Sequence, residues 1–177
     1  MPSTESAFPE PDATRVACSD EGAVARFASR LAAALPPTVM LAIEGDLGAG
    51  KTTFVKKLAA AVGIDPAEVT SPTFTLVQLH EVPPRADAQP LPPRLMHMDA
   101  YRLSGLDDLA TIGWEEMLAA PGWLAVEWPG RIAAALPHDR IELQIEITGE
   151  SSRTLHLSAT SPALQAALAE AVSGEEA

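Results

Sequence analysis

Two apolar patterns alternate along the chain: short continuous apolar runs, and longer segments in which apolar residues recur at helical spacing. Short apolar, partly β-branched runs predict buried strands over residues 15–18, 38–44, 74–79, 95–98 and 123–126. Segments with apolar positions three or four residues apart predict helices over about residues 20–35, 52–62, 106–118, 131–136 and 162–172. Strands that alternate with helices indicate an α/β fold with a mostly parallel sheet.

The pattern changes toward the C-terminus, where two strands follow each other directly. Every second residue is apolar in 141–147 and again in 155–157. This period predicts two half-buried strands, which we expect to form an antiparallel hairpin at the edge of the sheet. The predicted architecture is therefore a single-domain, three-layer α/β fold with a mostly parallel central sheet and an antiparallel C-terminal edge.

Turn and tail signals set the limits of this domain. Ser19 is the expected N-cap of the first helix, with Asp20 in its first turn. The segment 82–94 holds five prolines, which predict a surface loop. Residues 1–13 are Pro-rich and acidic and residues 173–177 are similar, so we expect disordered tails on both sides of a domain over residues 14–172.

Composition excludes several classes of protein. The 177 residues include 24 acidic and 12 basic side chains, a net charge of −12 that disfavours tight direct binding to nucleic acid. A lone cysteine, Cys18, excludes an intramolecular disulfide framework. We find neither a signal peptide nor an apolar run of the roughly 20 residues that a membrane span needs. We therefore expect a cytoplasmic protein without a membrane partner.

One glycine-rich segment carries most of the chemical information. Residues 45–52 match the phosphate-loop pattern G-x-x-x-x-G-K-[ST], and they lie between a predicted strand and a predicted helix, as that pattern requires. Bare backbone at a helix N-terminus lets amide groups surround phosphates. The candidate nucleotide contacts are Gly45, Asp46, Leu47, Gly48, Ala49, Gly50, Lys51, Thr52 and Thr53. The predicted fold is thus similar to that of P-loop NTPases.

Within this segment two side chains have distinct predicted roles. Lys51 is placed to reach the β- and γ-phosphates, and the Thr52 hydroxyl to bind Mg²⁺. Two acids follow apolar strands, Asp99 after residues 95–98 and Glu127 after residues 123–126. Such strand ends gather ligand groups in α/β sheets, so both acids are candidates for the magnesium site and for orienting an attacking water. Either acid could instead cap a helix or form a structural ion pair.

The absence of two motifs narrows the choice of nucleotide base. The chain contains no asparagine, which excludes the Asn-Lys-x-Asp motif that reads guanine. It also contains no Asp-x-x-Gly switch, so a Ras-like GTPase is disfavoured. We therefore expect adenine nucleotides, ATP or ADP, together with Mg²⁺.

Four motifs in order converge on a known family. The glycine-rich loop continues through Phe54 and is followed by Ser71-Pro-Thr-Phe-Thr-Leu-Val77, His97-Met-Asp-Ala-Tyr-Arg-Leu103 and Glu127-Trp-Pro129. The series resembles the TsaE (YjeE) family over about residues 18–153. The resemblance implies an ATPase required for threonylcarbamoyladenosine modification of tRNA, acting on a TsaB–TsaD complex that itself holds the tRNA. It also implies weak turnover in isolation.

The resemblance assigns further residues. Thr52 and Glu127 correspond to Mg²⁺ ligands, and Asp99 to a second acid that activates water or contacts the metal indirectly. Thr73, in a switch-like loop, corresponds to a sensor of the γ-phosphate. Trp128 corresponds to a residue that packs on the nucleotide or on a partner, although ordinary core packing is an equal alternative for an indole. Less distinctive matches are Asp20 and Arg153 near the nucleotide. The proline-rich loop is longer than the family pattern, and His80 replaces a common tyrosine.

Two other functions stay open at this stage. A small-molecule kinase would transfer the γ-phosphate to an acceptor, with Arg102, Arg131 and Arg153 as phosphate clamps. A nucleotide-gated binding module would regulate a partner by ATP occupancy, with negligible turnover.

Overall fold

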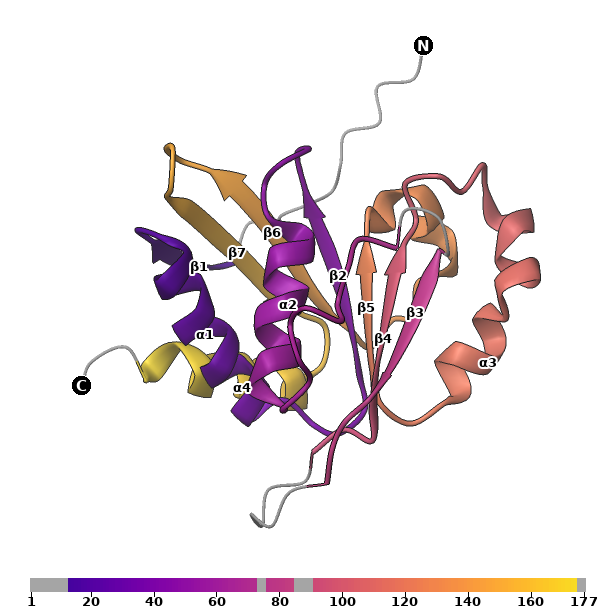
Figure 1. The fold of residues 1–177 in the computed structure, drawn as a ribbon, viewed down its shortest axis with the longest axis horizontal. Helices are drawn as coiled ribbons and strands as arrows, with labels where there is room; N and C mark the ends of the chain where they lie inside the picture. The colour runs from indigo at the N-terminus through magenta and orange to yellow at the C-terminus, as the bar shows by residue number, and fades with distance from the viewer. Residues whose placement is uncertain (1–12, 73–75, 85–90, 175–177) are drawn as a thin grey trace.

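The structure, a computed structural model, describes residues 13–72, 76–84 and 91–174. Its centre is one sheet in the order β1-β7-β6-β2-β5-β4-β3 (Figure 1). The strands are β1 (Thr14–Cys18), β2 (Val39–Gly45), β3 (Val77–Glu81), β4 (Arg94–Asp99), β5 (Trp123–Glu127), β6 (Ile141–Ile147) and β7 (Arg153–Ala159).

Helices cover both faces of this sheet. They are α1 (Glu21–Ala34), α2 (Lys51–Ala61), α3 (Trp114–Ala119) and α4 (Pro162–Ser173), with 3₁₀ helices η1 (Leu106–Ile112) and η2 (Pro129–Ala135). Alternate residues of β2 face opposite sides: Leu41 and Ile43 join the core formed with α1, α2 and α4, whereas Met40 joins the core formed with η1, α3 and η2. Figure 1 shows α1, α2 and α4 together on one side and α3 on the other. The two faces of β2 therefore contribute to two separate cores, one on each side of the sheet.

The middle of the sheet is parallel, as predicted. Strands β6, β2, β5 and β4 run in one direction, so their carboxyl ends meet along one edge of the fold. The predicted hairpin of β6 and β7 is confirmed. Its predicted place at the edge is wrong, because the N-terminal strand β1 pairs antiparallel with the outer side of β7. A second antiparallel pair, β3 with β4, forms the opposite edge.

Three local predictions need adjustment. The helix expected over residues 106–118 is divided into η1 and α3, because Gly113 between them adopts a left-handed φ of 72°. Asp20, not Ser19, caps α1: its Oδ1 accepts a 2.8 Å hydrogen bond from the Ala23 amide. The strand expected over residues 74–79 is observed as β3 at Val77–Glu81, and residues 74 and 75 lie outside the described residues.

Other expectations about the chain ends and loops are only partly covered. Helix α4 extends to Ser173, one residue beyond the expected end. Residues 1–12 and 175–177 of the expected tails, and residues 85–90 of the proline-rich loop, lie outside the described residues. In the part of the chain that the structure describes, no helix combines the length and apolar character needed to cross a membrane.

Burial predicts very different losses of stability for the same leucine-to-alanine substitution at two positions. Leu58, on α2, is fully buried, whereas Leu47, in the glycine-rich loop, is 88% exposed. We expect Leu58→Ala to lower the free energy of unfolding by about 2–5 kcal/mol, because it leaves a cavity in the core. Leu47→Ala should change it by no more than about 0.5 kcal/mol. Denaturant unfolding followed by circular dichroism checks both values, and equal losses would contradict the described packing of α2.

Candidate functional site

The glycine-rich loop connects the end of β2 to the start of α2. A Cβ on Gly45 would lie 2.7 Å from the Ile145 carbonyl oxygen, so no side chain fits there without a shift of β6. Gly50 caps α2 with a left-handed φ of 105°. These two positions require glycine, and they leave the N-terminus of α2 open to an approaching anion.

Lys51, the first residue of α2, is buried against this loop. Its Nζ donates to the carbonyl oxygens of Gly45 at 2.6 Å and Asp46 at 3.0 Å, and lies 3.7 Å from the centroid of the Trp128 ring. An ammonium has three N–H donors, so two carbonyls and one indole face engage all of them. Burial lowers the pKa of Lys51, and neighbouring carboxylates, Glu127 first among them, oppose that shift. A phosphate that approaches Lys51 must displace one of the three contacts.

Trp128 is held in an unusual backbone conformation beside Lys51. Its φ is 57°, in the left-handed region that bulky residues rarely adopt. Its amide donates to the Ile43 carbonyl at 3.1 Å, and its ring lies 5.1 Å from that of Tyr101. The Gly130 amide, two residues on, donates to Glu44 at 3.4 Å. Trp128 therefore lines the site, and the alternative of ordinary core packing does not describe it.

Glu127, at the end of β5, is only 3% exposed. Its Oε1 accepts a 2.7 Å hydrogen bond from the Thr52 hydroxyl. The same oxygen lies 2.7 Å from Nε2 of His97, which donates to it when the ring proton is on that nitrogen. Glu127 thus joins β5 to the first turn of α2.

Asp99 ends β4 directly opposite Glu127 in the strand register. Its Oδ1 accepts a 2.9 Å hydrogen bond from the Tyr101 amide and so closes the turn after the strand. Both acids line one cavity of about 420 Å³. The other lining residues are Leu47, Gly48, Gly50, Lys51, Thr52, Thr53, Ser71, Tyr101, Arg102 and Trp128.

A second cavity, of about 250 Å³, lies on the other side of the glycine-rich loop. Gly48, Gly50 and Thr53 line both cavities. Arg153 lines the second one and donates from Nε to the Ala49 carbonyl at 2.8 Å, which braces the loop against β7. Asp20 acts as the cap of α1, next to Glu21, which also lines this second cavity.

Most of the predicted site residues come together in this way. There are two exceptions: Asp20 caps α1 and lines neither of the two cavities, and Thr73 lies outside the described residues, so the nucleotide roles of both stay predictions. Sequence reasoning did not select Ser71, Tyr101 and His97 as site residues. A usable signal existed for His97, because it stands two residues before Asp99 in a strand and must therefore face the same side of the sheet.

The donor set fits a small, hard cation. The Thr52 hydroxyl and the carboxylates of Glu127 and Asp99 present oxygen to one cavity, and oxygen is the ligand atom that Mg²⁺ prefers. Among the described residues no group of three His, Cys, Asp or Glu side chains could hold an ion unaided. A cation here would need further oxygens, which nucleotide phosphates commonly supply.

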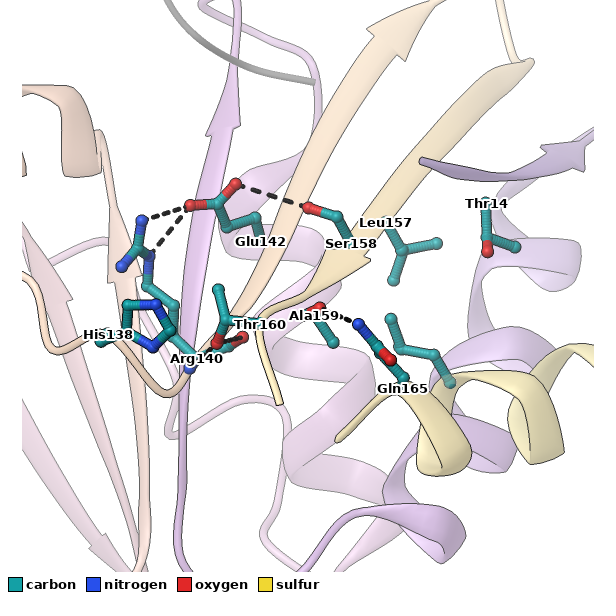
Figure 2. Close-up of a pocket in the computed structure, with 10 residues that line it drawn as sticks. Thr14, His138, Arg140, Glu142, Leu157, Ser158, Ala159, Thr160 and Gln165 are labelled. Carbon is teal, nitrogen blue, oxygen red and sulfur yellow. Dashed lines mark hydrogen bonds and ion pairs between the residues drawn. The ribbon is translucent and has the colours of Figure 1, made fainter. Parts of the chain in front are cut away.

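A third cavity, of about 560 Å³, lies beside the start of β6 and the end of β7, at the ends of these strands away from the glycine-rich loop (Figure 2). There the Arg140 guanidinium donates to Glu142 at 2.9 Å and 2.5 Å, and Ser158 donates to the other oxygen of Glu142 at 3.4 Å. Glu142 is 8% exposed, so it is a buried, paired acid like Glu127 but remote from the glycine-rich loop.

The fold and the site define the class: a mixed α/β protein built on one seven-stranded sheet, with a phosphate-loop sequence between β2 and α2. The chain is similar in structure to Bacillus subtilis YdiB, with a TM-score of 0.69 and 28% identity over 93% of this chain and 97% of that one.

Sequence comparison identifies the family. The family model described as "Threonylcarbamoyl adenosine biosynthesis protein TsaE" matches residues 18–155. A relative from Bacillus subtilis (strain 168), "tRNA threonylcarbamoyladenosine biosynthesis protein TsaE", is 37% identical over 75% of this chain and 77% of its own length. One of the same description from Treponema pallidum (strain Nichols) is 34% identical over 74% and 90%. The chain therefore belongs to the TsaE family, which takes part in tRNA threonylcarbamoyladenosine biosynthesis.

Proposed function

We propose that this protein is a Mg²⁺-dependent ATPase required for threonylcarbamoyladenosine modification of tRNA, and that it acts on a TsaB–TsaD complex. The observation that carries the proposal is the convergence of Lys51, Thr52 and Glu127 on one cavity beside the glycine-rich loop. Membership of the TsaE family supplies the biological process.

In this proposal each residue has a defined task. Lys51 exchanges its contact with the Trp128 ring for the β- and γ-phosphates of ATP. Thr52 and Glu127 hold Mg²⁺, which neutralises charge on the phosphates when bound. The direct Thr52–Glu127 contact favours Glu127 over Asp99 as the metal ligand. Asp99 then orients the attacking water, and the second cavity, with Arg153, takes the adenine end of the nucleotide.

The net negative charge of the chain disfavours direct binding of tRNA. A net charge of −12 repels tRNA, so the partner complex holds the tRNA and this protein couples nucleotide state to the arrangement of that complex. Because ATP and tRNA are cytoplasmic substrates, we place the activity in the cytoplasm. Turnover in isolation is weak, since the partner completes the site.

A small-molecule kinase is the second candidate, and one observation is compatible with it. Of the three arginines that a kinase could use as clamps, Arg102 lines the cavity that contains Lys51. An arginine there can stabilise charge during transfer of a phosphoryl group either to water or to another acceptor.

Phosphate release from Mg·ATP tests the proposal. The purified protein is assayed alone, with the TsaB–TsaD pair, and with that pair plus unmodified tRNA, using Lys51→Ala as the blank. Strong stimulation by the partners supports a coupled ATPase. Low turnover that the partners leave unchanged would overturn it in favour of the kinase or of a nucleotide-gated module. A non-hydrolysable ATP analogue that sustains repeated rounds of modification would favour the gated module.

A further inference from the structure

The carboxylate of Glu127 is held from within the protein by a histidine that the proposed mechanism does not use. We infer that His97 is a positioning residue for the cation site, fixing the Glu127 carboxylate so that it can bind Mg²⁺. The inference rests on the proposed function, because it assigns a role toward the same metal.

The strand geometry places His97 behind the acid. His97 lies on β4 opposite Ala125 of β5, and Glu127 is two residues further along β5, on the same face. The imidazole is fully buried, and its Nε2 lies 2.7 Å from Oε1 of Glu127. His97 therefore cannot contact a nucleotide itself and can act only through Glu127.

Both donors use the same oxygen of Glu127. Oε1 lies 2.7 Å from the Thr52 hydroxyl oxygen and 2.7 Å from the His97 nitrogen. Among the described residues, none donates a hydrogen bond to Oε2. If Thr52 turns its hydroxyl oxygen toward a cation, the His97 contact remains and prevents the carboxylate from rotating. Partners of this kind orient a metal-binding carboxylate and raise its affinity for the ion.

The surroundings of His97 argue against simple core packing. On its own face of the sheet, Leu95 two residues earlier on β4 and Ala125 opposite it on β5 are fully buried apolar residues. The Nδ1 of His97 is buried without a hydrogen-bond partner, so the contact with Glu127 is the one polar contact described for this ring. An apolar residue would avoid the cost of that unpaired nitrogen. The histidine is thus best explained by what it does to Glu127.

A second histidine–glutamate contact, outside the site, provides a control. Nε2 of His156 lies 2.8 Å from Oε2 of Glu146, His156 is 7% exposed, and its Nδ1 also lacks a partner. Neither residue lines the two cavities beside the glycine-rich loop. Glu146 is exposed, unlike Glu127, but a change at His156 still removes a buried imidazole and its contact with a glutamate without touching Glu127.

Binding of Mn²⁺ in the presence of saturating ADP, followed by electron paramagnetic resonance, tests the role. We expect His97→Met to weaken Mn²⁺ binding by about 10- to 100-fold. His97→Gln, whose amide can still donate to Glu127, should recover most of the affinity. His156→Met should leave it unchanged. Binding of ADP without metal should be unaffected in all three variants, because Lys51 and the loop backbone are intact.

Several results would overturn the inference. A folded His97→Met variant with wild-type Mn²⁺ affinity would do so, as would equal losses in the Met and Gln variants or in His156→Met. If His97→Met does not fold, His97→Asn takes its place, because its shorter amide does not reach Glu127. Absence of Mn²⁺ binding to the wild-type protein with ADP would instead overturn the proposed metal site itself.

Discussion

Lys51→Ala is expected to reduce ATP turnover by at least about 100-fold, the scale on which loss of one charge-stabilising donor acts in other enzymes. In the described structure the Lys51 ammonium is held at the glycine-rich loop by the carbonyls of Gly45 and Asp46. Its removal deprives the phosphates of their main positive partner. Phosphate release and calorimetric binding of ATP measure the effect.

A matched control lies on the same helix. Lys57 makes an ion pair of 2.6 Å with Glu21 and carries the same charge. Lys57→Ala therefore reproduces the change in net charge and in helix composition, and it should retain turnover close to wild type. A folded Lys51→Ala variant that still supports full tRNA modification would contradict the assignment of Lys51.

Glu127→Gln is expected to have the second large effect. Glutamine preserves the size of the side chain and one oxygen that can accept from Thr52, but it removes the negative charge that attracts a cation. Because a bound metal ion contributes several kcal/mol to such reactions, turnover should fall by about 100-fold or more. The dependence of phosphate release on Mg²⁺ concentration provides the measurement, and the variant should require far more Mg²⁺.

Glu142→Gln separates a metal role from the general cost of altering a buried acid. Glu142 is buried and paired with Arg140 at the other end of the sheet. Its substitution should lower stability but leave the Mg²⁺ dependence unchanged. Equal changes in Mg²⁺ dependence for the two variants would show that Glu127 has no special relation to the ion.

The local parts of the site could be predicted from the sequence because their geometry depends on neighbouring residues. A strand, a glycine-rich turn and a helix in succession define the position of Lys51 whatever the rest of the chain does. The end of a strand likewise locates Asp99 and Glu127. Which acid contacts Thr52 depends on strand order and register, and no local pattern contains that information.

The less local features were missed for the same reason. The ring of Trp128 reaches Lys51 because its backbone adopts a left-handed conformation that no residue type there announces. His97 belongs to a motif on β4, whereas its partner Glu127 lies on β5. The division of the helix over residues 106–118 differs from these, because Gly113, whose left-handed conformation separates η1 from α3, is a local signal in the sequence.

The pairing of β1 with β7 also bears on how the protein is made. Thr14 pairs with Leu157 and Cys18 with Arg153, so β1, the first of the described strands along the chain, pairs with β7, the last of them. Contacts so distant in sequence form slowly, because closing a long loop costs chain entropy. Until β7 is synthesised, β1 and one edge of β6 lack partners, and β6 carries the Ile145 backbone against which Gly45 rests. A chain truncated before β7 is therefore expected to lose the support of its glycine-rich loop even though every residue of that loop is present.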